Sequence, residues 1–186
     1  MPSGNTPHTS DAVPEPTPRA IGNLSAYRRF WIVGAIAWML DQATKQAVVS
    51  RLAYPTYGPP DSIVVVPGFM NLVHVGNTGA AWSMFTDRSI FLAILAVATL
   101  AAIFIWRRAL ALRESTVQLS FGLLCGGILG NLTDRLRYGH VVDFLDLHFG
   151  SYIYPTFNVA DSCICVGVGI YLVWSLRQPT KGESTK

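Results

Sequence analysis

The sequence predicts an all-α membrane protein, a four-transmembrane-helix bundle with a small β-platform on the outer face of the membrane. The composition is the first reason: 51% of the 186 residues are hydrophobic and only 13% are charged, whereas soluble domains have about 25% charged residues. The second reason is the presence of four apolar stretches, each long enough to cross a bilayer. The third is a set of polar and acidic residues gathered near one end of these stretches. The length suits one domain.

The four apolar stretches are residues 30–49, 89–106, 116–133 and 159–176. At a rise of about 1.5 Å per residue, roughly 18–20 residues match a hydrocarbon core of about 30 Å. The second stretch is apolar throughout, and the fourth is apolar after its first turn. The first is interrupted by Asp41 and Lys45, and the third by Gln118 and Asn131. These two helices are therefore predicted to face the interior of the bundle.

Small residues and strand signals complete the predicted architecture. Gly122, Gly126 and Gly130 recur at intervals of four in the third stretch, which predicts close packing against another helix. Between the first two helices, residues 56–76 are predicted to form the outer β segment, with short strands at 63–66 and 69–75 around a Pro-Gly turn.

The distribution of basic residues predicts that both termini are cytoplasmic. Residues before the first helix, after the second and after the fourth lie on one side of the membrane in a four-span topology, and they carry basic side chains. These side chains are Arg28, Arg29, Arg107, Arg108, Arg113, Arg177, Lys181 and Lys186. Residues 1–27, rich in Pro, Ser and Thr, are expected to be a disordered cytoplasmic tail, and 178–186 a second one, flanking a transmembrane domain at 28–177. The sequence has no Lys/Arg run, and no nucleic-acid partner is expected.

Asp41 and Lys45 lie one helical turn apart in the first apolar stretch. An ionisable residue at the centre of a transmembrane helix costs about 2.5–3.5 kcal/mol unless it is paired or hydrated. We predict that the two side chains pair inside the bundle. This spacing is compatible with a supporting role or with direct chemistry.

Asn131 and Arg135 are also four residues apart, at the outer end of the third helix. An amide and a guanidinium on one face hold neighbouring carboxylates or loop carbonyls. They either organise the helix end or face a substrate. Asp134 points to another side and is predicted to pair with Arg135 or Arg137.

Three aspartates lie near the outer boundary. Asp161 falls in the first turn of the fourth helix, and Asp143 and Asp146 follow the third. Two carboxyl groups brought together share a proton, so that one acts as a base toward water and the other donates to a carbonyl oxygen. This pair would suffice for amide hydrolysis. Spacing alone does not distinguish Asp143 from Asp146.

Other chemistries lack a motif in this sequence. There is no His-Glu-x-x-His and no Gly-x-Ser-x-Gly, and His74, His140 and His148 share no ligand spacing. No metal and no cofactor are expected. Two non-peptidase interpretations stay open: a proton-coupled transporter, disfavoured because the four helices contain no internal repeat, and an assembly subunit that binds another membrane protein.

From about residue 28 to residue 176, the chain resembles lipoprotein signal peptidase, the type II signal peptidase of bacteria. The resemblance rests on five blocks in the same order along the chain. These are Asp41-Gln42-x-x-Lys45, Asn77-Thr78-Gly79-Ala80-Ala81, Gly130-Asn131-x-x-Asp134-Arg135, Val141-Val142-Asp143-Phe144 and Phe157-Asn158-Val159-Ala160-Asp161-Ser162.

The resemblance implies an aspartyl endopeptidase of the bacterial cytoplasmic (inner) membrane, with its active site near the outer face. Such an enzyme cleaves prolipoproteins on the amino side of a diacylglyceryl-modified cysteine, by aspartate-activated water. Matched motif by motif, the catalytic dyad is Asp143 and Asp161. The substrate-binding and supporting positions are Asn77, Gly79, Asn131, Arg135, Asn158, Ala160, Asp41 and Lys45.

The same resemblance implies the partners of the chain. These are lipid-modified prolipoproteins, membrane lipids and globomycin-type cyclic peptide inhibitors, with the chain acting as a monomer. Trp82 stands where the family resemblance leads us to expect Phe, a change that bears on acyl-chain fit.

Overall fold

The structure is a computed structural model that describes residues 24–80 and 84–178. The two predicted tails, apart from residues 24–27 and residue 178, lie outside the described residues, as does Trp82. A short 3-10 helix, η1 (Leu24–Tyr27), precedes the first long helix.

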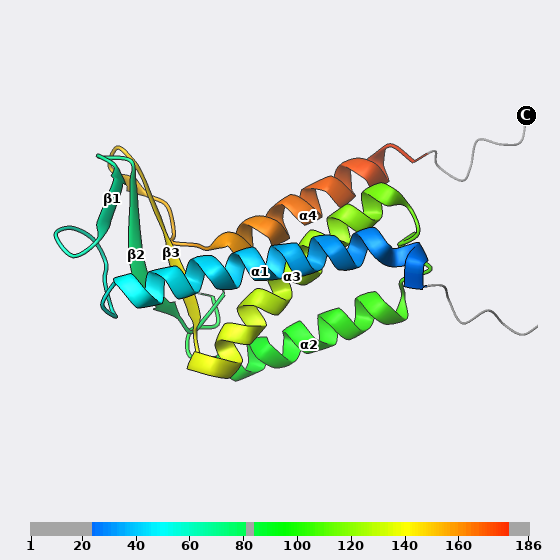
Figure 1. Cartoon of the computed structure of the whole chain (residues 1–186), viewed down its shortest axis with the longest axis horizontal. Helices are drawn as coiled ribbons and strands as arrows, with labels where there is room; N and C mark the ends of the chain where they lie inside the picture. The colour runs from blue at the N-terminus through cyan, green and yellow to red at the C-terminus, as the bar shows by residue number, and fades with distance from the viewer. Residues whose placement is uncertain (1–23, 81–83, 179–186) are drawn as a thin grey trace, which may run out of the picture.

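Four long helices lie side by side, with a small sheet at one end (Figure 1). They are α1 (Arg28–Arg51), α2 (Ser89–Ile105), α3 (Ser115–Tyr138) and α4 (Val159–Leu176). All four predicted stretches are thus helical, but α1 and α3 extend beyond the predicted bounds because both continue through polar residues. The end of α3 is set by Gly139, whose φ of 77° gives the left-handed conformation common after a helix.

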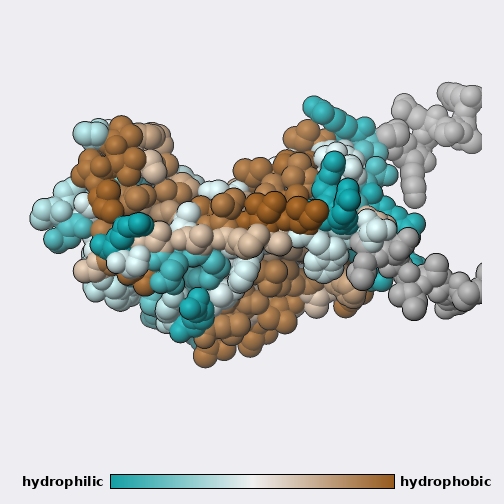
Figure 2. Space-filling model, in the orientation of Figure 1, coloured by the Kyte–Doolittle hydropathy of each residue, from teal (hydrophilic) through white to brown (hydrophobic). Residues whose placement is uncertain are grey.

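The helices differ in how well they suit a bilayer. By length and composition, α3 and α4 are long and apolar enough to cross a membrane, and α2 is apolar but has 17 residues. Large apolar side chains are exposed on α2 and α4, such as Ile94 (64% exposed) and Leu172 (55% exposed). These hydrophobic surfaces are visible along the helices in Figure 2. Exposed apolar surface of this extent marks contact with another apolar phase.

The sheet has four antiparallel strands in the order β1-β2-β3-β4. β1 (Ile63–Val66) and β2 (Met70–Asn77) are the two strands expected from the sequence. β3 (Val141–Phe149) and β4 (Tyr152–Ile153) were not predicted. The β-platform is therefore larger than residues 56–76, because the segment after α3 pairs along the whole length of β2.

Strand β3 separates its side chains onto two faces, as the period of a strand requires. Val142 and Phe144 pack on Val48 and Leu52 at the end of α1. Asp143, Leu147 and Phe149 line a cavity on the other side. β3 thus joins the sheet to the helices through one face and presents an acidic side chain on the other.

The glycine stripe of α3 packs against α1, as predicted. A Cβ atom added at Gly126 would lie 2.6 Å from the carbonyl oxygen of Gly34 and 2.7 Å from the Cβ of Ala37. One turn earlier, a Cβ added at Gly122 would lie 2.8 Å from the Cβ of Val33. Only glycine permits this approach, and it brings the polar residues of the two helices within hydrogen-bonding distance.

We expect Gly126→Ala to lower the thermal unfolding midpoint of the detergent-solubilised protein, since overpacking a tight contact costs about 1–3 kcal/mol. Gly169→Ala on α4 is the matched control, because nothing lies within 4 Å of a Cβ at that position. An equal midpoint for the two variants would contradict the packing assigned to Gly126.

Candidate active site

A buried ammonium group ties α1 to α3 below the sheet. Lys45 Nζ lies 2.9 Å from Asp41 Oδ2 and 2.8 Å from Asp134 Oδ2. All three side chains are at most 3% exposed. The predicted Asp41–Lys45 pair is confirmed, and it includes a second carboxylate.

The prediction for Asp134 was wrong, because it pairs with neither Arg135 nor Arg137. Besides Lys45, Asp134 accepts hydrogen bonds from Gln42 Nε2 (3.1 Å) and from the backbone N–H of Val142 (3.1 Å). The side chain of Asp134 points from α3 toward α1 rather than toward the loop that follows α3. It therefore links α1, α3 and the start of β3.

Asp41 connects the same network to α4. Its Oδ1 accepts a hydrogen bond of 2.9 Å from the backbone N–H of Ala160. Ala160 is fully buried, and its methyl group packs against α3 at Gly130. A Cβ atom added at Gly130 would lie 3.3 Å from the Ala160 Cβ. A larger side chain at position 160 would separate α3 from α4.

The amide of Asn131 has one orientation in this network. Its Oδ1 accepts from Lys45 Nζ at 2.9 Å and from Asn158 Nδ2 at 3.2 Å. An ammonium group only donates, so it must face the amide oxygen. The amide nitrogen of Asn131 consequently points to Asp161 and donates to its Oδ1 at 2.8 Å.

Two further asparagines hold Asp143 in the same way. Asn77 Oδ1 accepts from the backbone N–H of Gly79, and Asn158 Oδ1 accepts from the backbone N–H of Asp161. With their oxygens thus engaged, both amides turn their nitrogens toward Asp143. Asn77 Nδ2 donates to Oδ2 at 2.9 Å and Asn158 Nδ2 donates to Oδ1 at 2.7 Å.

Asp161 is fixed by the first turn of α4. Asn158 is the N-cap of this helix, and Asp161 Oδ2 accepts from the Asn158 backbone N–H at 3.2 Å in a reciprocal capping box. The free N–H groups at a helix N-terminus stabilise a negative charge there. Asn158 therefore contacts both carboxyl groups, one through its side chain and one through its backbone.

Asp143 and Asp161 both line a cavity of about 1030 Å³. The surface is hollowed between the sheet and α4 (Figure 2). The polar end of the cavity contains the two carboxyl groups with Asn77, Asn131 and Arg135. An apolar arm continues along the sheet and α4 and includes Leu147, Phe149, Tyr154, Ile164 and Val166.

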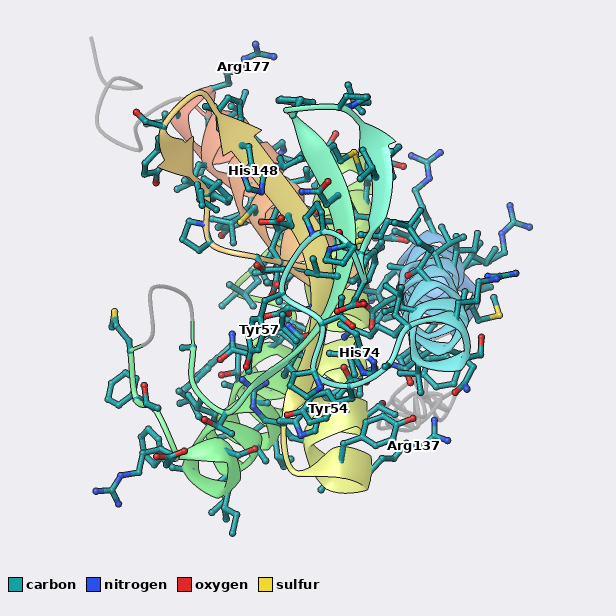
Figure 3. All side chains as sticks on the ribbon, turned by 90° about the vertical axis from the view of Figure 1, so that its left-hand side faces the viewer. Tyr54, Tyr57, His74, Arg137, His148 and Arg177 are labelled. Carbon is teal, nitrogen blue, oxygen red and sulfur yellow. The ribbon has the colours of Figure 1, made fainter. Side chains whose placement is uncertain are left out.

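Asp146 faces away from this cavity. It lies three residues after Asp143 on β3, so the two side chains leave opposite faces of the strand. Asp146 Oδ2 lies 2.6 Å from His148 Nε2 and accepts from Asn71 Nδ2 at 3.1 Å. His148 is at the far end of the sheet from His74 (Figure 3).

Burial raises the pKa of Asp143 from 3.8 to about 7, and the neighbouring carboxyl group of Asp161 adds to the shift. The amide donors of Asn77 and Asn158 oppose it. A substantial share of Asp143 is consequently protonated at neutral pH.

Arg135 holds the loop after β2 against the cavity. Its Nη2 donates to the carbonyl oxygen of Gly79 at 2.8 Å, and its Nη1 donates to that of Asn131 at 3.4 Å. The prediction that Arg135 binds a loop carbonyl is confirmed. The remaining guanidinium nitrogen, Nε, is buried without a partner among the described residues.

All ten site residues predicted from the sequence lie in this cavity or in the network beneath it. The sequence prediction missed Gln42 as a link between Asp41 and Asp134. The Asp41-Gln42 pair in an apolar helix was its available signal. The sequence analysis also did not predict β3, the strand whose two faces carry the side chains of Asp143 and Asp146.

Comparison with known proteins identifies related sequences. Residues 33–177 match the model of a protein family described as signal peptidase II. A protein named lipoprotein signal peptidase from Geobacter metallireducens is 41% identical over 155 residues, covering 81% of this chain and 92% of the relative. One of the same name from Aeromonas hydrophila is 38% identical over 165 residues, covering 87% and 95%.

Two solved structures are also similar to this chain. One described as a bacterial membrane enzyme has a TM-score of 0.73 and 29% identity, covering 84% of this chain and 93% of that chain. A second with that description has a TM-score of 0.68 and 31% identity, covering 81% and 94%. The fold is thus similar to that of bacterial membrane enzymes.

The raised pKa of Asp143 predicts a pH dependence of stability. Between the unfolded value of 3.8 and the folded value of about 7, the folded state retains a proton that the unfolded chain has lost. Stability should therefore decrease as pH rises through this window, by at most about 1.4 kcal/mol per pH unit. Asp143→Asn should show a flatter unfolding-midpoint profile and exceed the parent in stability at about pH 8.

The control for this profile is Asp61→Asn, which changes an exposed aspartate. Its midpoint should follow that of the parent at each pH. Parallel profiles for the parent and Asp143→Asn would show that Asp143 does not titrate in this range.

Proposed function

This chain belongs to the signal peptidase II family, and from that premise we propose that it is an aspartic endopeptidase that removes signal peptides from lipid-modified prolipoproteins. The peptidase class and the lipoprotein substrate follow from the family. The proposal adds the dyad, Asp143 and Asp161, and cleavage on the amino side of the diacylglyceryl-modified cysteine. The observation that carries it is that these two carboxyl groups, each held by amide donors, line one cavity.

In the proposed mechanism, Asp161 acts as the base and Asp143 as the acid. The Asp161 carboxylate takes a proton from water, whose oxygen attacks the scissile carbonyl carbon, and Asp143 donates its proton to the carbonyl oxygen. When the C–N bond breaks, the proton taken by Asp161 passes to the amine of the cysteine, and one hydroxyl of the tetrahedral diol returns its proton to Asp143. The raised pKa of Asp143 supports its role as the protonated member.

We propose that all four helices span the cytoplasmic membrane, with both termini cytoplasmic and the sheet on the outer face. The sheet lies at one end of the helices and η1 at the other (Figure 1). Asp143 belongs to β3 of this sheet, and Asp161 belongs to the first turn of α4. The Arg-rich segments lie at the η1 end. At the sheet end, a diacylated cysteine stays anchored by buried methylenes worth about 0.8 kcal/mol each.

The proposed partners follow from the same arrangement. The apolar arm of the cavity, near Ile164 and Val166, would receive acyl or apolar side chains of the prolipoprotein. Globomycin-type cyclic peptides would compete for this cavity, and the chain would act as a monomer surrounded by membrane lipids. The mechanism uses no metal and no cofactor.

A transporter that moves protons through Asp41 and Lys45 is poorly supported. Their side chains are 0% and 3% exposed, and Lys45 is paired with two carboxylates. An assembly subunit would need no carboxyl pair in a large cavity. Both alternatives predict that the purified chain does not cleave a lipopeptide.

We expect Asp143→Asn and Asp161→Asn each to abolish cleavage of a synthetic diacylglyceryl peptide by the purified protein. A loss of at least about a thousandfold is expected, since an amide can serve neither as base nor as acid. The matched control is Asp146→Asn, a buried aspartate on the opposite face of β3. Normal cleavage by either dyad variant, with the fold intact, would falsify the assignment.

Asn158→Ser separates the two roles of Asn158. Serine keeps an N-cap oxygen for the Asp161 N–H but is too short to donate to Asp143. We expect the cleavage rate to fall about twofold to tenfold, as for the loss of one hydrogen bond to a neutral acid. The unfolding midpoint should fall less than in Asn158→Ala, although serine also loses the donation to Asn131 Oδ1. Asn158→Ala, which removes both contacts, should lower both quantities. Wild-type cleavage by Asn158→Ser would show that the amide donor is dispensable.

A further inference from the structure

The connection between α2 and α3 is a folded turn rich in arginine. The backbone N–H of Leu112 donates to Arg107 O at 3.1 Å, and that of Ala111 donates to Arg108 O at 3.2 Å. Leu112 is 3% exposed and packs in the core cluster that contains Val117. Ala111 has a φ of 55°, in the left-handed region. These contacts give the turn a defined shape.

The turn borders an open cavity of about 540 Å³ whose lining is mostly basic. Its lining residues are Arg107, Arg108, Ala111, Leu112, Arg113 and Glu114. Arg107 is held in place, because its Nη1 donates to Phe104 O at 2.8 Å and its guanidinium lies 4.5 Å from the centre of the Phe104 ring. Within residues 24–80 and 84–178, none of the three arginines forms a salt bridge. Three guanidinium groups outnumber the single carboxylate of Glu114, so the lining of the cavity carries a net positive charge that suits an anion.

An apolar strip of α2 leads to this cavity. Ile94, Val97 and Phe104 lie on one face of the helix and are 64%, 54% and 60% exposed. Trp106, 61% exposed, follows as the C-cap and precedes Arg107. Along α2, apolar side chains are followed by an indole and then by guanidinium groups. A phospholipid has the same order of polarity from its acyl chains to its phosphate. Tryptophan favours the interfacial depth, and guanidinium groups bind phosphate oxygens in pairs.

We propose that this arginine-lined cavity binds the phosphate of an anionic phospholipid headgroup. The position of the cavity in the inner leaflet rests on the proposed membrane orientation, whereas the binding itself is independent of the aspartate mechanism. Basic pockets beside transmembrane helices on the cytoplasmic side are suited to anionic headgroups. The lipid would hold the α2–α3 turn at the membrane surface.

Native mass spectrometry of the purified full chain in detergent tests this proposal. The probes are dioleoyl phosphatidylglycerol, dioleoyl phosphatidylcholine and inorganic phosphate. The test variant carries Arg107→Gln, Arg108→Gln and Arg113→Gln. The matched control carries Arg51→Gln, Arg88→Gln and Arg137→Gln, three exposed arginines at the sheet end of the helices.

We expect the parent and the control to retain phosphatidylglycerol in preference to phosphatidylcholine, and the test variant to lose this preference by at least about tenfold. An equal loss of this preference in both triple variants would show that lipid binding depends only on the overall charge of the protein, and would overturn the proposal. Displacement of the lipid by inorganic phosphate at equal concentration would make this a free-phosphate site and overturn it too.

Lipopeptide cleavage separates this proposal from the proposed function. The test variant should cleave at the parental rate in detergent, and Asp143→Asn should retain phosphatidylglycerol while it loses cleavage. The two measurements therefore test the lipid site and the peptidase function independently.

Discussion

The buried ammonium group of Lys45 is the constraint on which the site depends. It neutralises charge from Asp41 and Asp134 and, through its third contact, fixes the amide of Asn131. Removing a charge from water costs several kcal/mol, which only close pairing and hydrogen bonding offset. Each of its partners also binds the backbone or side chains of another element, so the geometry of α1, α3, β3 and α4 is specified from one point.

This ion cluster can form only because the helices approach closely. Gly126 and Gly130 allow α1 to lie against α3, and Gly127 allows the Ala160 carbonyl of α4 to contact α3 from the other side. Larger side chains at these positions of α3 would separate the Asp134 carboxylate from Lys45. The buried charges therefore depend on the small residues that let the helices approach.

The helices and part of the site could be predicted from local patterns in the sequence, whereas Asn77, Gly79, Asn158 and Ala160 were assigned from the family resemblance. Apolar runs set the helices, and spacings of four placed Asp41 beside Lys45. Strand β3 could not be predicted in this way, since its pairing with β2 joins segments separated by α2 and α3. Without that strand, the residue pattern alone could not choose between Asp143 and Asp146. The choice came from the family resemblance, and the alternation of β3 gives it a physical basis.

The use of asparagines around the carboxyl pair has a consequence for its chemistry. Asn77, Asn131 and Asn158 fix the orientation of Asp143 and Asp161 with neutral donors. A lysine or arginine in contact with Asp143 would hold it firmly too, but would strongly favour its ionised form. With amide donors, burial and the neighbouring acid dominate, and they raise the pKa of Asp143 to about 7. The ammonium group of Lys45 lies one layer deeper, where it orients Asn131 and lowers the pKa of Asp143 less than burial raises it.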